Sequence, residues 1–440
     1  MRQGRVFFRR ALWAAVLVWA LLVGSEVRSA FHLPAHVLLL PGQEWGVDVG
    51  RWLTVVDGSA GQLSIEASGE RGLLVKGRQL GSGRIQLRLF GLFPLRSVEV
   101  NVVPQLSVVP GGQAIGVLLS SQGLVIAQTT PVVDAEGTVR YPAREAGLLA
   151  GDILVEVGGQ QVRSAEQVQE IVDGLARRGE PVPVVVLREG ARLRRTVQPV
   201  PVTVQQGGVP MTVYRLGLRL ERPAAGVGTL TFYEPTQLRF AGLGHMITDG
   251  FNNRVEVSDG RIVEATIQGI QQGARGFPGE KIGVFDASRG EMGVIEKNTP
   301  YGIYGVLHEP PRHGYIDYPV PVALAHEVKP GDAVMLTVVD GQAVEAYRLR
   351  ILQVLPHRRH DGRGLVIQVT DERLLEATRG IIQGMSGSPI LQNGKLVGAV
   401  THVFVNDPTR GYGILAEWMA YEAGILQEAA ENVEESPFIR

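Results

Sequence analysis

The residues best suited to covalent chemistry lie in the segment Gln383–Pro389, which reads QGMSGSP. A serine among small residues fits a tight turn, and such a turn is also what a nucleophilic hydroxyl needs to reach a substrate carbonyl. Asn393-Gly394 predicts a hairpin shortly after it, with a buried strand returning from Leu396. These letters alone do not decide between a structural turn and a nucleophile.

A serine on a turn just before a hairpin resembles the layout of trypsin-like peptidases around their nucleophile. In those enzymes the backbone N–H groups of the serine and of a glycine two residues earlier bind the oxyanion. Here these donors fall on Gly384 and Ser386. Ser388 is the rival hydroxyl, but it lies one step too far from the donor pair. The Gly-x-Ser-x-Gly elbow of α/β-hydrolases does not fit, because its last position is Ser388.

A serine of this kind needs a base, and His245 is the strongest candidate among the nine histidines. It follows an apolar run and a Gly-x-Gly in RFAGLGHMITDG, which places it at a strand end where it can face a cleft. Imidazole titrates near neutrality, so it can take the serine proton and later return it. His402, on the strand after the hairpin, and Thr401 are candidate neighbours of the specificity pocket.

The third member should be a carboxylate that orients the imidazole. Asp371 lies at the end of a buried-looking strand in GLVIQVTDERLLEATRG, but an aspartate at a helix start is also stabilising without any catalysis. The residues alone leave this choice open among four carboxylates, Asp371, Asp249, Asp286 and Asp317.

Composition sets the broad class. With 440 residues, 45% of them hydrophobic and 20% charged, the chain is globular and long enough for two to four domains. The 56 glycines and 25 prolines favour many short strands joined by turns. A net charge of -1 gives no basic footprint for nucleic acid, and the absence of cysteine excludes a thiol nucleophile.

The N-terminus indicates export. Arg2, Arg5, Arg9 and Arg10 precede an uncharged apolar run from Ala11 to Gly24, as in a signal peptide or a membrane anchor. We therefore expect residues 1–30 to form a signal or anchor helix and the rest of the chain to lie outside the cytoplasm.

Three further segments are expected. Residues 31–103 read as short alternating strands, typical of a small β-sandwich. Residues 104–200 resemble a PDZ domain through the run Ala146-Gly147-Leu148, Gly151-Asp152-Ile153-Leu154 and Gly158-Gly159, with a helix from Ser164 to about Arg178. This resemblance implies a peptide groove whose carboxylate-binding loop is assigned to Ala114-Ile115-Gly116-Val117. Residues 201–440 are again rich in strands, with helices expected at 372–378 and at about 415–430.

A signal segment, a PDZ domain, GLGHMITDG and TDERLLEATRGIIQGMSGSPI together resemble the SpoIVB peptidase family, from about Val108 to about Trp418. These are sporulation serine peptidases of endospore-forming bacteria. The resemblance implies a trypsin-like double β-barrel in a mainly β protein, with His245, Asp371 and Ser386 as the catalytic triad. It also implies action in the forespore intermembrane space, self-cleavage, and cleavage of a membrane-bound regulator that releases an intramembrane protease and activates a late sigma factor.

Two other interpretations belong to different classes. One is an exported PDZ scaffold with an inactive barrel, which an intact triad disfavours. The other is a stress-type protease, which the order of the domains disfavours because such enzymes generally carry PDZ domains after the protease. No spacing typical of a metal or cofactor site occurs, so none is expected, and the partners are expected to be protein substrates, the chain itself and a peptide in the PDZ groove.

Overall fold

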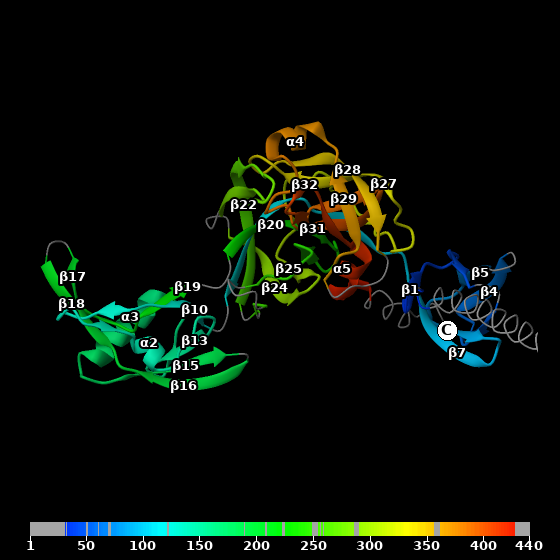
Figure 1. Cartoon of the computed structure of the whole chain (residues 1–440). Helices are drawn as coiled ribbons and strands as arrows, with labels where there is room; N and C mark the ends of the chain where they lie inside the picture. The colour runs from blue at the N-terminus through cyan, green and yellow to red at the C-terminus, as the bar shows by residue number, and fades with distance from the viewer. Residues whose placement is uncertain are drawn as a thin grey trace, which may run out of the picture.

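The computed structural model describes residues 31, 33–49, 52–59, 61–68, 72–120, 123–188, 190–206, 209–221, 225–248, 254–255, 257, 259–285, 290–355 and 361–426. This part of the chain is mainly β, with a PDZ domain and an N-terminal β unit on either side of two central barrels (Figure 1). The predicted signal or anchor helix, residues 1–30, lies outside the described residues. No helix in the described part has the length and hydrophobicity of a transmembrane segment.

The N-terminal unit consists of two sheets that enclose one core. Alternate residues such as Leu39, Val75 and Val100 point into it, as the alternating sequence predicts for a sandwich. One sheet has the order β1-β7-β6-β3 and the other β2-β5-β4. The strands are β1 (His36–Leu39), β2 (Glu44–Asp48), β3 (Leu53–Asp57), β4 (Leu63–Ser68), β5 (Gly72–Gly77), β6 (Gly81–Leu89) and β7 (Phe93–Val102).

The first central barrel closes because β20 pairs with both β9 and β21, giving the ring β21-β25-β24-β22-β9-β20. The strands of the ring are β9 (Ala114–Ser120), β20 (Ala225–Tyr233), β21 (Arg239–Gly242), β22 (Asp259–Gln271), β24 (Glu291–Thr299) and β25 (Gly302–Leu307). Attached to it are β8 (Ser107–Pro110), β23 (Glu280–Phe285) and β26 (Val320–Pro321).

The second barrel is closed in the order β27-β28-β29-β32-β31-β30. Asn393 and Gly394 both have positive φ, 51° and 74°, and form the two-residue turn that the sequence predicts. Phe232 and Tyr304 of the first barrel share a core with this one. Its elements are β27 (Gly331–Val338), β28 (Val344–Val354), β29 (Leu365–Val369), α4 (Glu372–Thr378), β30 (Pro389–Gln392), β31 (Lys395–Phe404), β32 (Asp407–Leu415) and α5 (Ala416–Glu422).

The PDZ domain is built on one sheet and one long helix. The helix starts after Ser164 as predicted, with the Ser164 hydroxyl accepting a hydrogen bond from the Gln167 N–H at 3.2 Å, and it buries Val168 and Val172. The sheet order is β16-β15-β13-β10-β19. The elements are β10 (Leu124–Thr129), β11 (Val132–Val133), β12 (Val139–Arg140), α2 (Pro142–Glu145), β13 (Ile153–Val157), β14 (Gln160–Gln161), α3 (Ala165–Ala176), β15 (Val182–Arg188), β16 (Ala191–Val197), β17 (Val200–Gln206), β18 (Val209–Arg215) and β19 (Leu218–Glu221).

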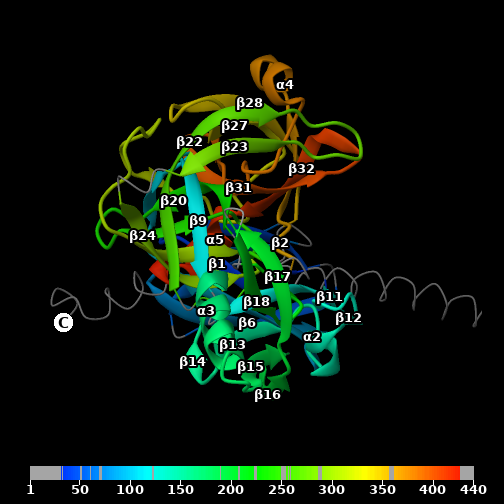
Figure 2. The ribbon, with the colours of Figure 1, turned by 90° about the vertical axis from the view of Figure 1, so that its left-hand side faces the viewer.

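The predicted boundaries of the PDZ domain, 104 and 200, are wrong, because the domain is inserted into the first barrel. Residues 107–120 form β8 and β9, and β9 pairs with β20 on one side and β22 on the other. Leu118 lies opposite Ala225, so the chain leaves the barrel and re-enters it on neighbouring strands (Figure 2). The glycines of this segment, which resembled a PDZ loop, serve close packing: a Cβ at Gly116 would lie 2.5 Å from the Phe285 ring.

The insertion predicts which deletions the barrels tolerate. Replacing residues 121–224 by a short Gly-rich turn should leave both barrels folded, because the strands to be joined are already hydrogen-bonded neighbours. A chain that starts at residue 201 should not fold, because without β9 the edges of β20 and β22 are unpaired. Circular dichroism and thermal unfolding compare the two, and equal stability of both would contradict the insertion.

Candidate active site

The segment Gln383–Ser388 forms a tight turn that requires its glycines. Gly384 and Gly387 have φ of +91° and +95°, in the left-handed region. A Cβ at Gly387 would lie 2.1 Å from the Thr229 carbonyl oxygen, so no other residue fits there. The Ser388 N–H donates to the Met385 carbonyl at 2.9 Å and closes the turn around Ser386. We call Gln383–Ser388 the serine segment.

Both barrels hold the serine segment. From β20 of the first barrel, the Thr229 hydroxyl donates to the Gly384 carbonyl and the Thr231 hydroxyl to the Gly387 carbonyl, each at 2.8 Å in buried surroundings. The Thr229 N–H also donates to the Ser386 carbonyl at 3.0 Å. From β31 of the second barrel, the Val400 carbonyl accepts from the Gly387 N–H at 2.8 Å. The carbonyls thus face into the protein.

This arrangement leaves two donors available at the nucleophile. Among the described residues, neither the Gly384 N–H nor the Ser386 N–H has a hydrogen-bond acceptor. They are the two donors that the sequence predicts for an oxyanion hole. The Ser386 hydroxyl itself donates to the Thr401 carbonyl at 2.7 Å. Ser388 is fully buried and bonded to the Thr337 hydroxyl at 2.9 Å, so it is not the nucleophile.

His245 is fixed at the end of β21 as predicted. Its Nδ1 lies 2.8 Å from the Met246 carbonyl oxygen. A carbonyl can only accept, so Nδ1 carries the proton and Nε2 is left unprotonated. Ile247, which follows Met246, is also held. The Asn298 side chain accepts from the Ile247 N–H and donates to the Ile247 carbonyl, each at 2.9 Å.

His245 and the serine segment meet at β31. The Gly387 backbone packs against Leu243, and a Cβ at Gly244 would lie 2.8 Å from the Thr401 methyl group. The Thr401 carbonyl is also the group that accepts the hydrogen bond of the Ser386 hydroxyl. The ring of His402 is centred 5.1 Å from that of His245. Ser386, His245, Thr401 and His402 therefore belong to one site, as the sequence indicates.

Burial keeps both imidazoles neutral. It lowers the pKa of His245 below 6.5, against the opposing effect of the hydrogen bond to Met246. Burial lowers the pKa of His402 to about 4, and electrostatic repulsion from His245 and Arg363 adds to this effect. At neutral pH, His245 is therefore a free base.

The structure does not place Asp371 beside His245, so the predicted contact between them is wrong for this conformation. Val366 of β29 shares a row with Tyr412 and His402. Asp371 follows the end of β29 as the N-cap of α4, and in the described part of the chain no hydrogen bond joins it to His245. Its buried carboxylate accepts from the Arg348 N–H at 3.1 Å and from the Arg373 N–H at 3.1 Å, so it caps α4. Burial raises the pKa of Asp371, but the hydrogen bonds and charge of Arg373 outweigh it and lower the pKa.

The other predicted carboxylates do not replace it. Asp249 and Asp286 lie outside the described residues, and Asp317 is exposed near Tyr233. Asp361 lies close enough to His402 for its charge to oppose part of the lowering of the His402 pKa. Sequence reasoning missed the two threonines of β20 and Asn298, since each acts on a segment far away in the chain. Their only local signal is a buried polar residue within an apolar strand.

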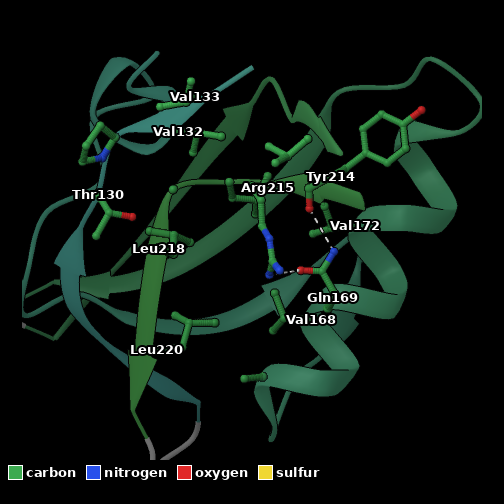
Figure 3. A pocket seen from close by; sticks show the side chains of 15 residues that line it. Thr130, Val132, Val133, Val168, Gln169, Val172, Tyr214, Arg215, Leu218 and Leu220 are labelled. Carbon is green, nitrogen blue, oxygen red and sulfur yellow. Dashed lines mark hydrogen bonds between the residues drawn. The ribbon is translucent and has the colours of Figure 1, made fainter. Parts of the chain in front are cut away.

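A groove of the PDZ domain lies between α3 and β19, where the resemblance implies a peptide site (Figure 3). Val168, Leu218 and Leu220 line it, and its volume is about 440 Å³. At one end the Gln169 side chain donates to the Tyr214 carbonyl at 2.9 Å and accepts from Arg215 at 3.0 Å.

The predicted loop Ala114-Ile115-Gly116-Val117 is wrong, because these residues are interior parts of β9 in the first barrel. The turn that enters the groove strand is instead 216–217, between β18 and β19, where Gly217 has φ of +71°. The glycine before the alternating residues LRLE is the signal that could have identified it.

No metal site emerges: in the described ranges, no three His, Asp or Glu side chains cluster closely enough to hold an ion.

Comparison with known families agrees with this architecture. Residues 212–420 match the family model of the SpoIVB peptidase S55, and residues 134–188 match that of a PDZ domain. The peptidase region of the chain, residues 212–420, belongs to the SpoIVB peptidase S55 family. The peptidase match includes His245, Asp371 and Ser386 but not β9, although β9 completes the first barrel.

Individual relatives match only part of this chain. A Mesorhizobium japonicum protein named as a zinc metalloprotease is 39% identical over 83 residues, 19% of this chain and 21% of the relative. A Synechocystis protein named as the serine protease HhoB is 38% identical over 79 residues, 18% of this chain and 17% of the relative. The chain thus spans about one fifth of the length of these relatives.

Solved structures give a distant likeness. The active form of the Rv3671c protease from M. tuberculosis is 18% identical, with a TM-score of 0.26 and coverage of 46% of this chain and 74% of that one. Its inactive form has the same identity, a TM-score of 0.25 and coverage of 46% and 84%. Likeness at this level says nothing about the chemistry of this chain.

The pH dependence should report His245. Protonated His245 cannot accept the Ser386 proton, so kcat/KM should rise with pH on the acid side, with half of the maximum below pH 6.5 because burial lowers this pKa. Initial rates on a peptide substrate measure it. His308→Gln, at an exposed histidine, should leave this limb unchanged, and a midpoint well above 6.5 would exclude a buried neutral base.

Substitution of Asp371 separates the two roles considered for it. Asp371→Ala should lower the free energy of unfolding by about 1–3 kcal/mol, because it removes the cap of α4 and the acceptor of the Arg348 N–H. At temperatures where the variant is folded, kcat/KM should fall less than about tenfold. A loss of about 10³-fold or more in folded protein would instead assign this carboxylate to catalysis.

Proposed function

We propose that the chain is a serine endopeptidase in which Ser386 is the nucleophile and His245 is the general base and then the general acid. The observation that carries this proposal is the pair of N–H groups, from Gly384 and Ser386, that have no acceptor among the described residues and flank the Ser386 hydroxyl. A turn used only for structure has no need of two unsatisfied donors beside a serine.

The reaction follows from these groups. The Ser386 hydroxyl leaves the Thr401 carbonyl, transfers its proton to His245 Nε2 and attacks the substrate carbonyl carbon. The oxygen of that carbonyl becomes negatively charged and is bound by the N–H groups of Gly384 and Ser386. The proton on Nε2 then passes to the leaving amine as the peptide bond breaks, and water hydrolyses the acyl-enzyme by the same steps.

The Met246 carbonyl has the orienting role that a carboxylate has in trypsin-like peptidases. It fixes the tautomer of His245 through the 2.8 Å contact to Nδ1 and accepts from the imidazolium that forms. A carbonyl carries no full charge, so it stabilises the imidazolium less than a carboxylate does. We therefore expect a modest kcat, which suits a peptidase that cuts few substrates.

The substrate would bind as an extended strand. Strand β30 pairs with β31 only up to Pro389 opposite Ala399, while β31 continues to Phe404. In the described part of the chain, residues 401–404 therefore have one edge without a partner strand, beside Ser386. Backbone addition to such an edge supplies affinity without demanding a particular sequence. The PDZ groove would capture a second segment of the substrate on β19.

For the biological role, we propose the one implied by the resemblance. The peptidase would act outside the cytoplasm in sporulation signalling, cleaving itself and a membrane-associated regulator so that an intramembrane protease activates a late sigma factor. The basic N-terminus followed by the apolar run of residues 11–24 supports export or anchoring.

Ser386 should be the residue labelled by a fluorophosphonate probe in folded protein. Ser386→Ala should abolish labelling and lower kcat by about 10⁴-fold or more, because the nucleophile is lost. Mass spectrometry of the labelled peptide and cleavage assays measure the two effects. Ser97→Ala, an exposed serine of β7, is the matched control and should behave as the parent.

Two results would contradict the proposal. Cleavage by Ser386→Ala at the parental rate would assign the chemistry elsewhere. Absence of both labelling and cleavage in the folded parent would favour the PDZ scaffold with an inactive barrel. The variant that lacks residues 121–224 separates capture from cleavage, since it should still cleave short peptides but lose protein substrates that depend on the groove.

A further inference from the structure

Lys281 is a buried lysine directly behind the serine segment. It lies near the start of β23, and its side chain is only 4% exposed. Its Nζ donates to the Thr337 hydroxyl at 2.8 Å, and the Ser388 hydroxyl donates to the same oxygen at 2.9 Å. Thr337 and Ser388 are both fully buried. The three side chains thus connect β23 of the first barrel, β27 of the second barrel and the end of the serine segment.

Lys281 also contacts the start of the serine segment. Its N–H donates to the Gln383 carbonyl at 3.0 Å, and the Gln383 N–H donates to Gly279 at 2.8 Å. A Cβ at Gly384 would lie 3.1 Å from both Cβ and Cδ of Lys281. The lysine stem therefore packs where a side chain at Gly384 would be, immediately behind one of the two oxyanion donors.

No charged partner accounts for this lysine. Its neighbour on β22 is Ile270, its neighbour on β27 is Thr337, and the serine segment holds no titratable residue. Among the described residues, Lys281 forms no salt bridge. Burial alone lowers the pKa of Lys281 to about 7. Burying a lysine without a carboxylate destabilises a fold relative to an apolar residue of similar length, so stability does not explain its presence.

We propose that Lys281 is a positioning residue of the peptidase site, holding Thr337 and Ser388 through its ammonium group and Gly384 through its stem. It thereby keeps the N–H groups of Gly384 and Ser386 directed at the substrate oxygen. The inference rests on the proposed function, and it names the residue that sets the geometry of the oxyanion hole. A destabilising group retained beside a reactive site fits the frequent exchange of stability for activity.

The protonation state of Lys281 gives the proposal a distinct signature. The ammonium form only donates hydrogen bonds and places a positive charge behind the oxyanion donors, whereas the neutral amine has no charge and a lone pair that can accept. Activity should therefore fall as the pH rises through about 7. Together with the acid limb set by His245, this gives a bell-shaped pH dependence of kcat.

The decisive variant is Lys281→Met, which keeps the length and the apolar stem but removes the charge. We expect kcat to fall about tenfold or more with KM changed less than about threefold, because oxyanion binding acts on the transition state. The alkaline limb should disappear. Lys297→Met, at an exposed lysine of β24, is the control and should keep both kcat and the limb. Thr337→Val should act like Lys281→Met, while Thr337→Ser, which keeps the hydroxyl, should act like the parent.

Thermal unfolding supplies a readout that a packing role would not give. The pKa of Lys281 is 10.5 in an ordinary environment and about 7 in the fold. Between these values the unfolded chain binds more protons, so stability rises with pH, and the destabilisation is fully present only below about 7. Lys281→Met should therefore raise the melting temperature at pH 7 and below, with a smaller gain as the pH approaches 10.5.

Two outcomes would overturn the inference. If Lys281→Met keeps the parental kcat and alkaline limb, Lys281 does not position the site. If it loses stability and activity together while the limb persists, the lysine serves packing alone. Failure of the folded parent both to cleave and to react at Ser386 would instead remove the proposed function itself. Should Lys281→Met not fold, the Thr337→Val and Thr337→Ser pair gives the same comparison.

Discussion

Two threonine hydroxyls of one strand fix the geometry of the whole site. Thr229 and Thr231 of β20 each donate a 2.8 Å hydrogen bond to a carbonyl of the serine segment, although the segment follows them by some 155 residues. These carbonyls are bound inside the protein, while the N–H groups of Gly384 and Ser386 have no acceptor among the described residues. This arrangement leaves the two N–H groups available to bind an oxyanion, as we propose. The barrels must stay in register for it to hold, and their shared core of residues such as Phe232 keeps them so.

Sequence reasoning reached the parts of the site that depend on local pattern. The Asn-Gly turn, the helices that begin after Ser164 and Asp371, and a histidine at a strand end all follow from residues within one or two turns of chain. Spacing from the two backbone donors favours Ser386 over Ser388 as the nucleophile, and the full burial of Ser388 agrees with that choice.

What could not be predicted depends on which distant strands are neighbours. The predicted PDZ loop Ala114-Ile115-Gly116-Val117 is a strand of the first barrel, where a Cβ at Gly116 would meet the Phe285 ring. Asp371 lies 15 residues before Ser386, and in the sequence this position is compatible with a catalytic triad. In the fold its carboxylate instead accepts hydrogen bonds from the N–H groups of Arg348 and Arg373. Lys281 carries no sequence signal, because a lysine between glutamate and isoleucine reads as a surface residue.

The inserted PDZ domain also sets an order in time. Strand β9 is synthesised early, but its partner β20 emerges only after the complete PDZ domain, about a hundred residues later. The PDZ domain has its own core and can fold meanwhile, whereas the first barrel cannot close. Thr229 and Thr231, which hold the serine segment, lie on β20 itself, and the serine segment follows them by about 155 residues. A nascent chain is thus unable to complete its peptidase site until its PDZ domain has been synthesised.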